Sequence, residues 1–397
     1  MDFRQEIIKQ IKKNTNLKEV NLEIPPAGLG DYAFPCFSLA KIYKKNPIQI
    51  AQELAEKIKA NRPQWDTPRG VPFIERVEAK GSYLNFFVNK TIIAENILKK
   101  VTKDKDKFGS KSKKQKILVE HTSINPNASP HIGRARNALI GDFIVRLLKF
   151  QGYDVETHYF VNDVGKQIAM LVLGAKNKKN IVFGDLLKLY IKINKKIEEN
   201  PALEKDVFEL LRKLEQGDEK IKKQFRDIVD ICVKGQTKIL SELGIKYDKF
   251  DYESDYLWTK KTDKVLEELE KTGKLFLDDE KRYVLDQKDL NLPMENPFLV
   301  LTRADKTSLY PLRDIAYNID KKKDKSIIVL GEDQKLYFEQ TKAALTLLGK
   351  PSPQPVFYSF LLVETGKMST RKGNLVLLED FMEEAVKRAR IEIKKRH

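Results

Sequence analysis

The stretch KILVEHTSINPNASPHIGRARNALIGDFIVRLLKFQGYDVETHYFV, residues 116–161, decides the fold class of this chain. It opens with a short apolar strand over 117–121, and a polar loop then leads into an apolar-rich helix over 131–150. Gly152 stands where helices commonly end, and residues 154–161 form a second strand pattern. This succession predicts an α/β fold with a Rossmann-like doubly wound parallel sheet.

The rest of this sheet is expected much later in the chain. KSIIVLGEDQ, residues 325–334, predicts a strand ending in a polar loop, followed by a helix over 337–348 and a strand over 355–362. Residues 171–245 are helical in pattern and heavily charged, which predicts a helical insertion in the sheet. The helix over 131–150 is expected to bury its larger apolar residues, which are Leu139, Ile140, Phe143, Ile144, Leu147 and Leu148.

The residues before the sheet predict a small α+β domain. Amphipathic helices are expected over 1–20 and 47–58, and the alternating pattern of 73–88 predicts strands. A lysine-rich segment, VTKDKDKFGSKSKKQK, has the composition of a solvated linker. We therefore expect an N-terminal domain over 1–105 and a catalytic domain over 106–397.

Composition limits the function classes. The 397 residues carry 74 Lys and Arg against 57 Asp and Glu, a net charge of +17 that favours a polyanionic partner or reflects a lysine-rich proteome. Two cysteines exclude a disulfide scaffold and a thiolate zinc site, and with four histidines no protein metal site is expected. Without a secretory leader or a membrane-length apolar run, a cytoplasmic protein without a membrane partner is expected.

The loop INPNASPHIGRARN, residues 124–137, follows the first strand, where open α/β sheets bind ligands. The amides at the start of its helix offer donors and partial positive charge to an anion. His131 and Arg134 lie one turn apart and project to the same side, while Pro130 restrains the approach and Gly133 leaves room for a flat ring. The alternative is a basic helix start with solvated side chains.

A second motif, GKMSTRKGN, spans residues 366–374. Lys367, Arg371 and Lys372 can neutralise charge that develops during nucleotidyl transfer, with the hydroxyls of Ser369 and Thr370 beside them. The alternative is a flexible basic surface loop. It is not a P-loop, because GxxxxGK[ST] occurs nowhere in the chain.

Together the two motifs carry a resemblance to a known family. HIGR at 131–134 resembles the HIGH motif of class I aminoacyl-tRNA synthetases, and KMSTR at 367–371 resembles their KMSKS motif. The surrounding sequence is similar to arginyl-tRNA synthetases from about residue 20 to 385, in EIPPAGLGDYAFPCFSLAK, VEHTSINPNASPHIGRARNALIGD, YFVNDVGKQI, TSLYPLRDIAY, VLGEDQ and KMSTRKGN.

The resemblance implies an arginine–tRNA ligase. The carboxylate of L-arginine would attack the α-phosphorus of ATP, pyrophosphate would leave, and the arginyl group would pass to the 3′ end of tRNA(Arg). ATP would come with Mg²⁺ bound through its phosphates, and a monomer is expected. Most of the catalysis would be alignment of two anions and stabilisation of a charged transition state.

The resemblance also implies site residues. ATP binding falls to Pro130, His131, Gly133, Arg134, Lys367, Met368, Ser369 and Arg371, and catalysis to His131, Arg134, Lys367 and Lys372. Arginine binding falls to Glu120, Ser123, Asn125, Tyr310, Asp314 and Gln334. Apart from the resemblance, Glu253 in DYESDY is a second carboxylate that could meet a guanidinium. In the N-terminal domain, Tyr83, Asn85 and Phe86 would contact the tRNA elbow; alternatively, this stretch is two strands packed on a core.

Asp314 has a physical warrant of its own, because a guanidinium is a rigid fork of donors that a planar carboxylate fits best. The alternative for Asp314 is a helix-start residue that pairs with Arg313 or Lys321.

The sequence departs from the family pattern in three places. Arg134 replaces the last histidine of HIGH, Thr370 replaces a lysine of KMSKS, and the sequence ends soon after this motif without an anticodon-binding module. A fragment is therefore expected, or a C-terminal domain supplied in trans. One alternative function is a synthetase-like paralogue that binds arginine or tRNA without completing catalysis. Another class I nucleotidyl transferase would not explain the N-terminal segment or YPLRD.

Overall fold

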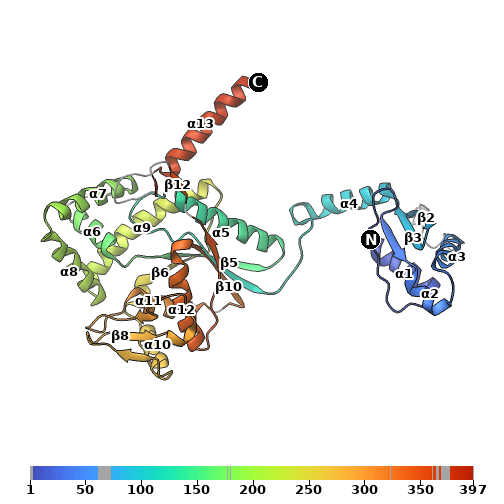
Figure 1. Cartoon of the computed structure of the whole chain (residues 1–397). Helices are drawn as coiled ribbons and strands as arrows, with labels where there is room; N and C mark the ends of the chain where they lie inside the picture. Colours follow the sequence, from blue (N-terminus) through green and yellow to red (C-terminus); the bar gives the residue numbers. More distant parts are fainter. Residues whose placement is uncertain are drawn as a thin grey trace. The chain divides into compact units, whose positions relative to one another are not determined.

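The chain divides into two compact units in the computed structural model, Met1–Gly109 and Ser110–His397 (Figure 1). The structure describes residues 3–60, 73–176, 178, 180–321, 323–359, 361–363, 366–367 and 376–396. No helix among the described residues is long and apolar enough to cross a membrane.

The N-terminal unit is a three-stranded antiparallel sheet with helices packed on it. Its strand order is β1 (Tyr32–Pro35), β3 (Tyr83–Val88) and β2 (Ile74–Lys80). Gly81 supplies the positive φ of +58° that the tight β2–β3 turn needs. The helices are α1 (Phe3–Thr15), α2 (Phe37–Tyr43), α3 (Pro47–Ala60) and α4 (Lys90–Asp104), as the sequence predicts for a small α+β domain.

The second unit is built on a five-stranded parallel sheet, which confirms the predicted Rossmann-like fold. Its order is β11 (Gln354–Tyr358), β10 (Lys325–Gly331), β4 (Lys116–Glu120), β5 (Asp154–Val161) and β6 (Lys249–Tyr252). Helix α5 (Ile132–Phe150) connects β4 to β5, and α12 (Lys335–Leu347) connects β10 to β11. The strand order reverses between β4 and β10, so a crevice is expected at their carboxyl ends.

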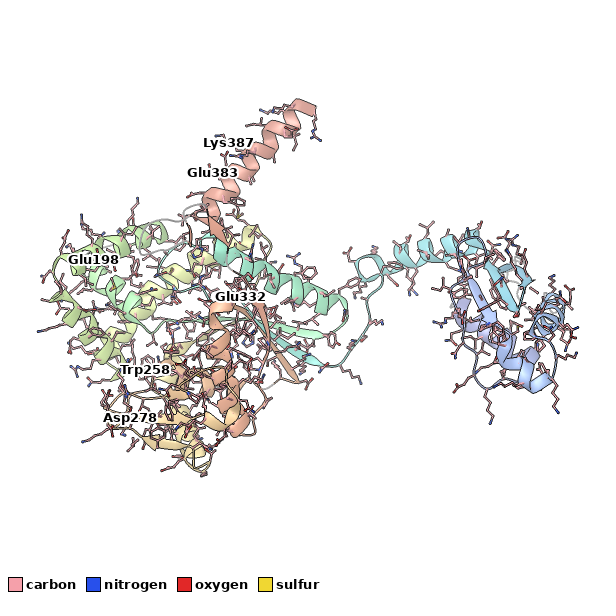
Figure 2. All side chains as sticks on the ribbon, viewed as in Figure 1. Glu198, Trp258, Asp278, Glu332, Glu383 and Lys387 are labelled. Atoms are coloured by element: carbon pink, nitrogen blue, oxygen red, sulfur yellow. The ribbon has the colours of Figure 1, made fainter. Side chains whose placement is uncertain are left out.

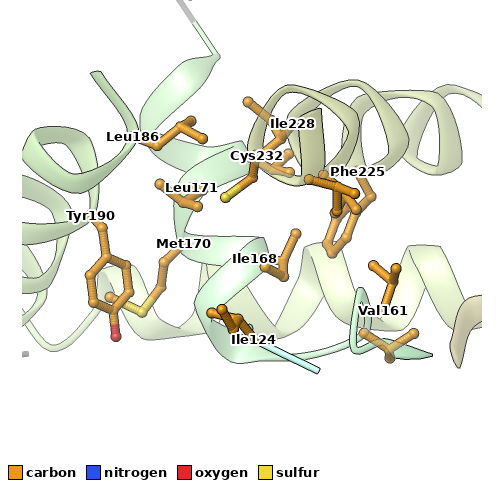
Figure 3. Packing of buried hydrophobic residues seen from close by; sticks show 14 of the residues in the cluster. Ile124, Val161, Ile168, Met170, Leu171, Leu186, Tyr190, Phe225, Ile228 and Cys232 are labelled. Atoms are coloured by element: carbon orange, nitrogen blue, oxygen red, sulfur yellow. The ribbon is translucent and has the colours of Figure 1, made fainter. Parts of the chain in front are cut away.

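Two insertions interrupt this sheet. Helices α6 (Lys166–Ala175), α7 (Phe183–Glu199), α8 (Leu203–Glu215) and α9 (Glu219–Glu242) lie between β5 and β6 and share one apolar core, part of which Figure 3 shows. Between β6 and β10, α10 (Lys261–Glu270) and α11 (Tyr310–Asp320) flank a small antiparallel sheet that the sequence did not predict. Its strands are β7 (Leu275–Leu277), β8 (Tyr283–Asp286) and β9 (Phe298–Val300).

The last elements are the pair β12 (Leu362–Val363) and β13 (Gly366–Lys367) and the helix α13 (Leu378–Arg396). Figure 2 shows α13, with Glu383 and Lys387, extending away from the sheet of its unit.

The prediction for the buried face of α5 is wrong at Leu139, Phe143 and Leu147, which are 48%, 66% and 43% exposed. The buried residues of this helix are Ala135, Asn137, Ala138, Gly141 and Val145. The reason is close packing: a Cβ added to Gly141 would lie only 2.1 Å from Cγ of His121. Small residues therefore face the sheet at this point, and Leu139, Phe143 and Leu147 remain on the outer side, whereas Ile144 and Leu148 pack partly against the core.

Candidate active site

The loop after β4 makes a sharp, strained turn. Thr122 and Ser123 have φ angles of +79° and +42°, a conformation that a β-branched residue such as threonine rarely adopts. Asn137 of α5 holds the turn, because its Oδ1 accepts a 2.5 Å hydrogen bond from the Thr122 N–H and its Nδ2 donates to the Val329 carbonyl at 2.8 Å. One buried amide thus joins the β4 loop, α5 and β10. Asn137 is not among the site residues predicted from the sequence.

Helices of the insertion hold the next part of this loop. The Asn125 side-chain amide donates to Gln167 Oε1 at 3.2 Å, and the Asn127 amide donates to the same atom at 2.9 Å. Gln236 of α9, which is 0% exposed, donates to the Ala128 carbonyl at 2.8 Å. The sequence contains a signal for this contact, because Gln236 lies on the apolar face of its helix and a buried polar group needs a hydrogen-bond partner.

The start of α5 is prepared for an anion. His131 occupies the N-cap position, and its buried Nδ1 has no hydrogen-bond partner among the described residues. Burial, together with the charge of Arg134, lowers the pKa of His131 to about 4, so the ring is neutral at pH 7. A neutral ring carries one N–H that can donate to a phosphate oxygen. Arg134 is exposed beside it, Gly133 is half-buried and Pro130 is buried.

The segment that follows the KMSTR motif is joined to this helix start. The Ile132 N–H donates to the Val376 carbonyl at 3.0 Å, and the Leu378 N–H donates to the Pro130 carbonyl at 2.8 Å. The structure describes the backbone of Lys367, in β13. Four other predicted residues of this motif lie outside the described residues: Met368, Ser369, Arg371 and Lys372.

Asp314 lies one turn into α11, with Tyr310 at the start of the helix. The Tyr337 hydroxyl of α12 donates to Oδ2 of Asp314, and the Tyr310 and Tyr337 rings lie 5.1 Å apart. Burial raises the pKa of Asp314 to about 6. Gln334 is exposed directly after β10.

The two cations that sequence reasoning offered as partners for Asp314 are paired elsewhere. Lys321 Nζ lies 2.6 Å from Glu120 Oε2, and Arg313 Nε lies 2.8 Å from Glu253 Oε1. All four of these side chains are at most 6% exposed. The alternative in which Asp314 pairs with Arg313 or Lys321 is therefore wrong.

Glu120 belongs to a buried polar network. The Tyr317 hydroxyl lies 2.9 Å from Oε2 of Glu120 and 2.9 Å from Oδ2 of Asp251. His158 shares hydrogen bonds of 2.5 Å with Asp251 and 2.8 Å with Glu156. Although burial opposes it, these two carboxylates raise the pKa of His158. Glu120 is thus held firmly by the protein itself at the end of β4.

Glu253 is committed to an internal ion pair with Arg313 and is 2% exposed. Burial raises its pKa to about 7, although Arg313 opposes this shift. Glu253, Arg313 and Tyr310 are among the residues that line a cavity of about 300 Å³. The role of Glu253 in binding arginine remains a prediction.

Two residues predicted to contact tRNA are not at the surface. Phe86 is 0% exposed in the core of the N-terminal unit, and Asn85 is 4% exposed, with its Cβ 3.4 Å from where a Cβ on Gly30 would lie. This corrects the prediction for both side chains, because Phe86 lies in the apolar core and Asn85 lies against the backbone at Gly30. Tyr83 is half-buried, and its ring meets the 51% exposed Phe37 edge-on at 5.6 Å.

Among the described residues, no group of three or more His, Cys, Asp or Glu could hold a metal ion.

Two family models match this chain. The model for the tRNA synthetases class I (R) catalytic domain matches residues 95–397, and the model for the arginyl tRNA synthetase N-terminal domain matches residues 2–88. The chain belongs to the arginyl-tRNA synthetase family. The resemblance in the sequence is thus confirmed. A different class I nucleotidyl transferase is excluded, because it would not carry the N-terminal match of an arginyl-tRNA synthetase.

The curated relatives of this arginyl-tRNA synthetase family member are arginine–tRNA ligases. The one from Methanocaldococcus jannaschii is 40% identical over 415 residues, which cover 100% of this chain and 71% of the relative. The one from Methanothermobacter thermautotrophicus is 39% identical, covering 95% of this chain and 66% of the relative. The structure of Thermus thermophilus arginyl-tRNA synthetase matches the fold with a TM-score of 0.66 at 24% identity, over 100% of this chain and 71% of that one.

Proposed function

We propose that this chain is an arginine–tRNA ligase that forms arginyl-adenylate from L-arginine and ATP and transfers the arginyl group to tRNA(Arg). The observation that carries this is the state of Asp314. Its carboxylate lies beside two tyrosine rings, while the neighbouring cations Arg313 and Lys321 are bound to other carboxylates. An external guanidinium is the cation that fits this open carboxylate.

ATP would bind at the start of α5. The neutral ring of His131 and the first helical turn would donate to its phosphates, and Mg²⁺ would arrive bound to those phosphates. Lys367, Arg371 and Lys372 would neutralise the pyrophosphate as it leaves. Ser123 and Asn125, on the strained loop between the two subsites, would hold the α-amino end of arginine. The arginine carboxylate would then meet the α-phosphorus already aligned.

tRNA(Arg) would be held largely through its phosphates, as the net charge of +17 suits. In the N-terminal unit, the exposed face of Phe37 and Tyr83 offers aromatic surface to an unpaired base. The protein would act in the cytoplasm as a monomer.

An anticodon-binding helical domain, in a longer form of this chain or in a second chain, would complete tRNA recognition. It would have apolar surface to pack on, because Leu139, Phe143, Leu147 and Phe150 form an exposed stripe at helical spacing on α5. Phe381 and Val386 of α13 are likewise 54% and 51% exposed.

The experiment that tests this function is tRNA charging with radiolabelled arginine. The natural chain is compared with Arg134→His, and with Arg146→His as a control at the exposed, far end of the same helix. Charging by the natural chain and by the control supports the proposal. If only Arg134→His charges, the natural chain is the synthetase-like binding paralogue, since the exposed Arg134 cation would then oppose the cationic substrate. Absence of charging, of arginine binding and of tRNA binding would contradict both functions.

A further inference from the structure

Tyr337 is not among the residues to which the sequence motifs or the proposed reaction give a role. It lies in the first turn of α12, and its hydroxyl donates to Oδ2 of Asp314 on α11. Its ring is tilted by 54° against the ring of Tyr310 at a centroid distance of 5.1 Å. Among the described residues, Tyr337 is the one side chain that hydrogen-bonds the Asp314 carboxylate.

Because of this bond, the two oxygens of the Asp314 carboxylate differ in their hydrogen bonding. Oδ2 is fixed by the phenol, and Oδ1 has no hydrogen bond from the described residues. A carboxylate whose one oxygen is anchored cannot rotate freely about its Cβ–Cγ bond, so the plane of its lone pairs is set before a ligand arrives. A guanidinium binds in the plane of a carboxylate through two parallel N–H donors, and each carboxylate oxygen can accept more than one bond. A preset plane therefore matters more for a guanidinium than for a spherical ammonium.

The same bond affects the charge of Asp314. Burial is the largest influence and raises its pKa, and Glu120 at the end of β4 raises it further. The Tyr337 bond lowers the pKa, as do Arg313 of α11 and Lys321 directly after α11, and the resulting pKa is about 6. Asp314 is therefore ionised at pH 7.5 with the Tyr337 bond in place, and its ionised fraction at that pH falls without it.

We infer that Tyr337 is a positioning residue of the arginine pocket, whose hydroxyl fixes the plane of the Asp314 carboxylate and whose ring, with Tyr310, forms a wall beside a flat guanidinium. This inference rests on the proposed function, because it names how the same pocket selects its substrate class. The selected class is amino acids that end in a planar, delocalised cation.

The test is binding of radiolabelled L-arginine by equilibrium dialysis between pH 5 and 8, on the full chain and on Tyr337→Phe. We expect Tyr337→Phe to weaken binding on the order of tenfold at pH 7, because it removes a hydrogen bond to a charged group. We also expect the pH midpoint below which binding fails to move upward, since Asp314 then keeps its proton to higher pH.

The matched control is Tyr256→Phe. The Tyr256 hydroxyl donates at 2.9 Å to Asp320, another carboxylate on the same helix, at the end away from Asp314. This control is expected to leave both the affinity for arginine and the pH midpoint unchanged. Thermal unfolding of both variants checks that each is folded.

A near-isosteric replacement covers the case in which Tyr337→Phe does not fold. With 3-fluorotyrosine at position 337 the phenol is a stronger donor, so the pH midpoint for arginine binding is expected to move downward. Unchanged affinity and an unchanged midpoint in the folded variants, while the natural chain binds arginine, would overturn the role of Tyr337. A natural chain that binds no arginine at any pH would instead refute the proposed function itself.

Discussion

The buried pair of Arg313 and Glu253 allows a sharp test of how the pocket is supported. Arg313 Nε lies 2.8 Å from Glu253 Oε1, and its Nη1 donates to the Ser308 carbonyl. The other carboxylate oxygen accepts from the Asn162 amide at 2.7 Å when that amide is oriented to donate. Replacing Arg313 by Met leaves this carboxylate buried at 2% exposure without a cation.

The magnitude follows from that burial. Removing one partner of a buried ion pair costs about 3–5 kcal/mol of unfolding free energy, whereas replacing both by apolar groups of similar volume is often close to neutral. We therefore expect Arg313→Met and Glu253→Leu each to cost at least ~3 kcal/mol, and the double variant to recover most of that loss.

The loss in Arg313→Met should depend on pH. Burial raises the pKa of Glu253 to about 7, and Arg313 works against this rise, so removing Arg313 raises the pKa further. The folded variant then keeps a proton that the unfolded chain releases at lower pH. Because a raised folded-state pKa gives stability that is lost as pH increases, the variant should lose more at pH 8 than at pH 6.

The assay is urea unfolding followed by the fluorescence of Trp258, which Figure 2 labels in the second unit, in a Trp65→Phe background. If each single variant lost less than ~1 kcal/mol of unfolding free energy, and the two losses simply added in the double variant, the reasoning would be refuted.

The double variant also tests Glu253 as a ligand. If Glu253 contacts arginine, the KM for arginine should rise in the double variant even though its stability is restored.

Three further predictions concern the packing around the site, the hydrogen bonds that hold its loop and its dependence on metal ions. Gly141→Ala should lower the unfolding free energy by at least ~2 kcal/mol in thermal melts, because its Cβ would meet His121, whereas Gly184→Ala, with no atom within 4 Å, should not. Asn137→Ala should raise the KM for arginine and cost about 1–3 kcal/mol of stability, since the buried Thr122 N–H loses its acceptor. A chelator should leave the melting temperature of the ligand-free chain unchanged while abolishing ATP–pyrophosphate exchange, because Mg²⁺ would enter only with ATP; a lowered melting temperature would contradict this.

The sequence predicted the parts of the fold that depend on local patterns. The strands and helix of residues 116–161 were predictable because their apolar periodicity and Gly152 are local signals. The buried face of α5 was not, because it depends on Gly141 meeting His121, and large apolar residues give no indication of where small ones are needed. The sheet β7–β8–β9 escaped prediction since its three- and four-residue strands are too short to show alternation.

For the candidate site, too, the sequence indicates some residues and gives no indication of others. Residues near the ends of elements, such as His131 before α5 and Asp314 one turn into α11, can be found from motifs and helix boundaries. The hydrogen bonds that hold these residues in place cannot be found in this way, because they join residues that are far apart in the sequence. The Tyr317 hydroxyl and Glu120, for example, are 197 positions apart. Asn85 and Phe86 failed as surface residues for a related reason. An alternating strand does not reveal which of its faces packs on the core or which loop covers the other face.

The charges around the pocket give a physical reason for selectivity. Two carboxylates there have a cation from the chain itself: Glu120 has Lys321, and Glu253 has Arg313. Asp314 instead has a neutral donor, the Tyr337 hydroxyl. One negative charge therefore remains, at the position where a single guanidinium would neutralise it. A neutral analogue would leave the Asp314 carboxylate without a cation, a cost that exceeds what a lost methylene contact could impose.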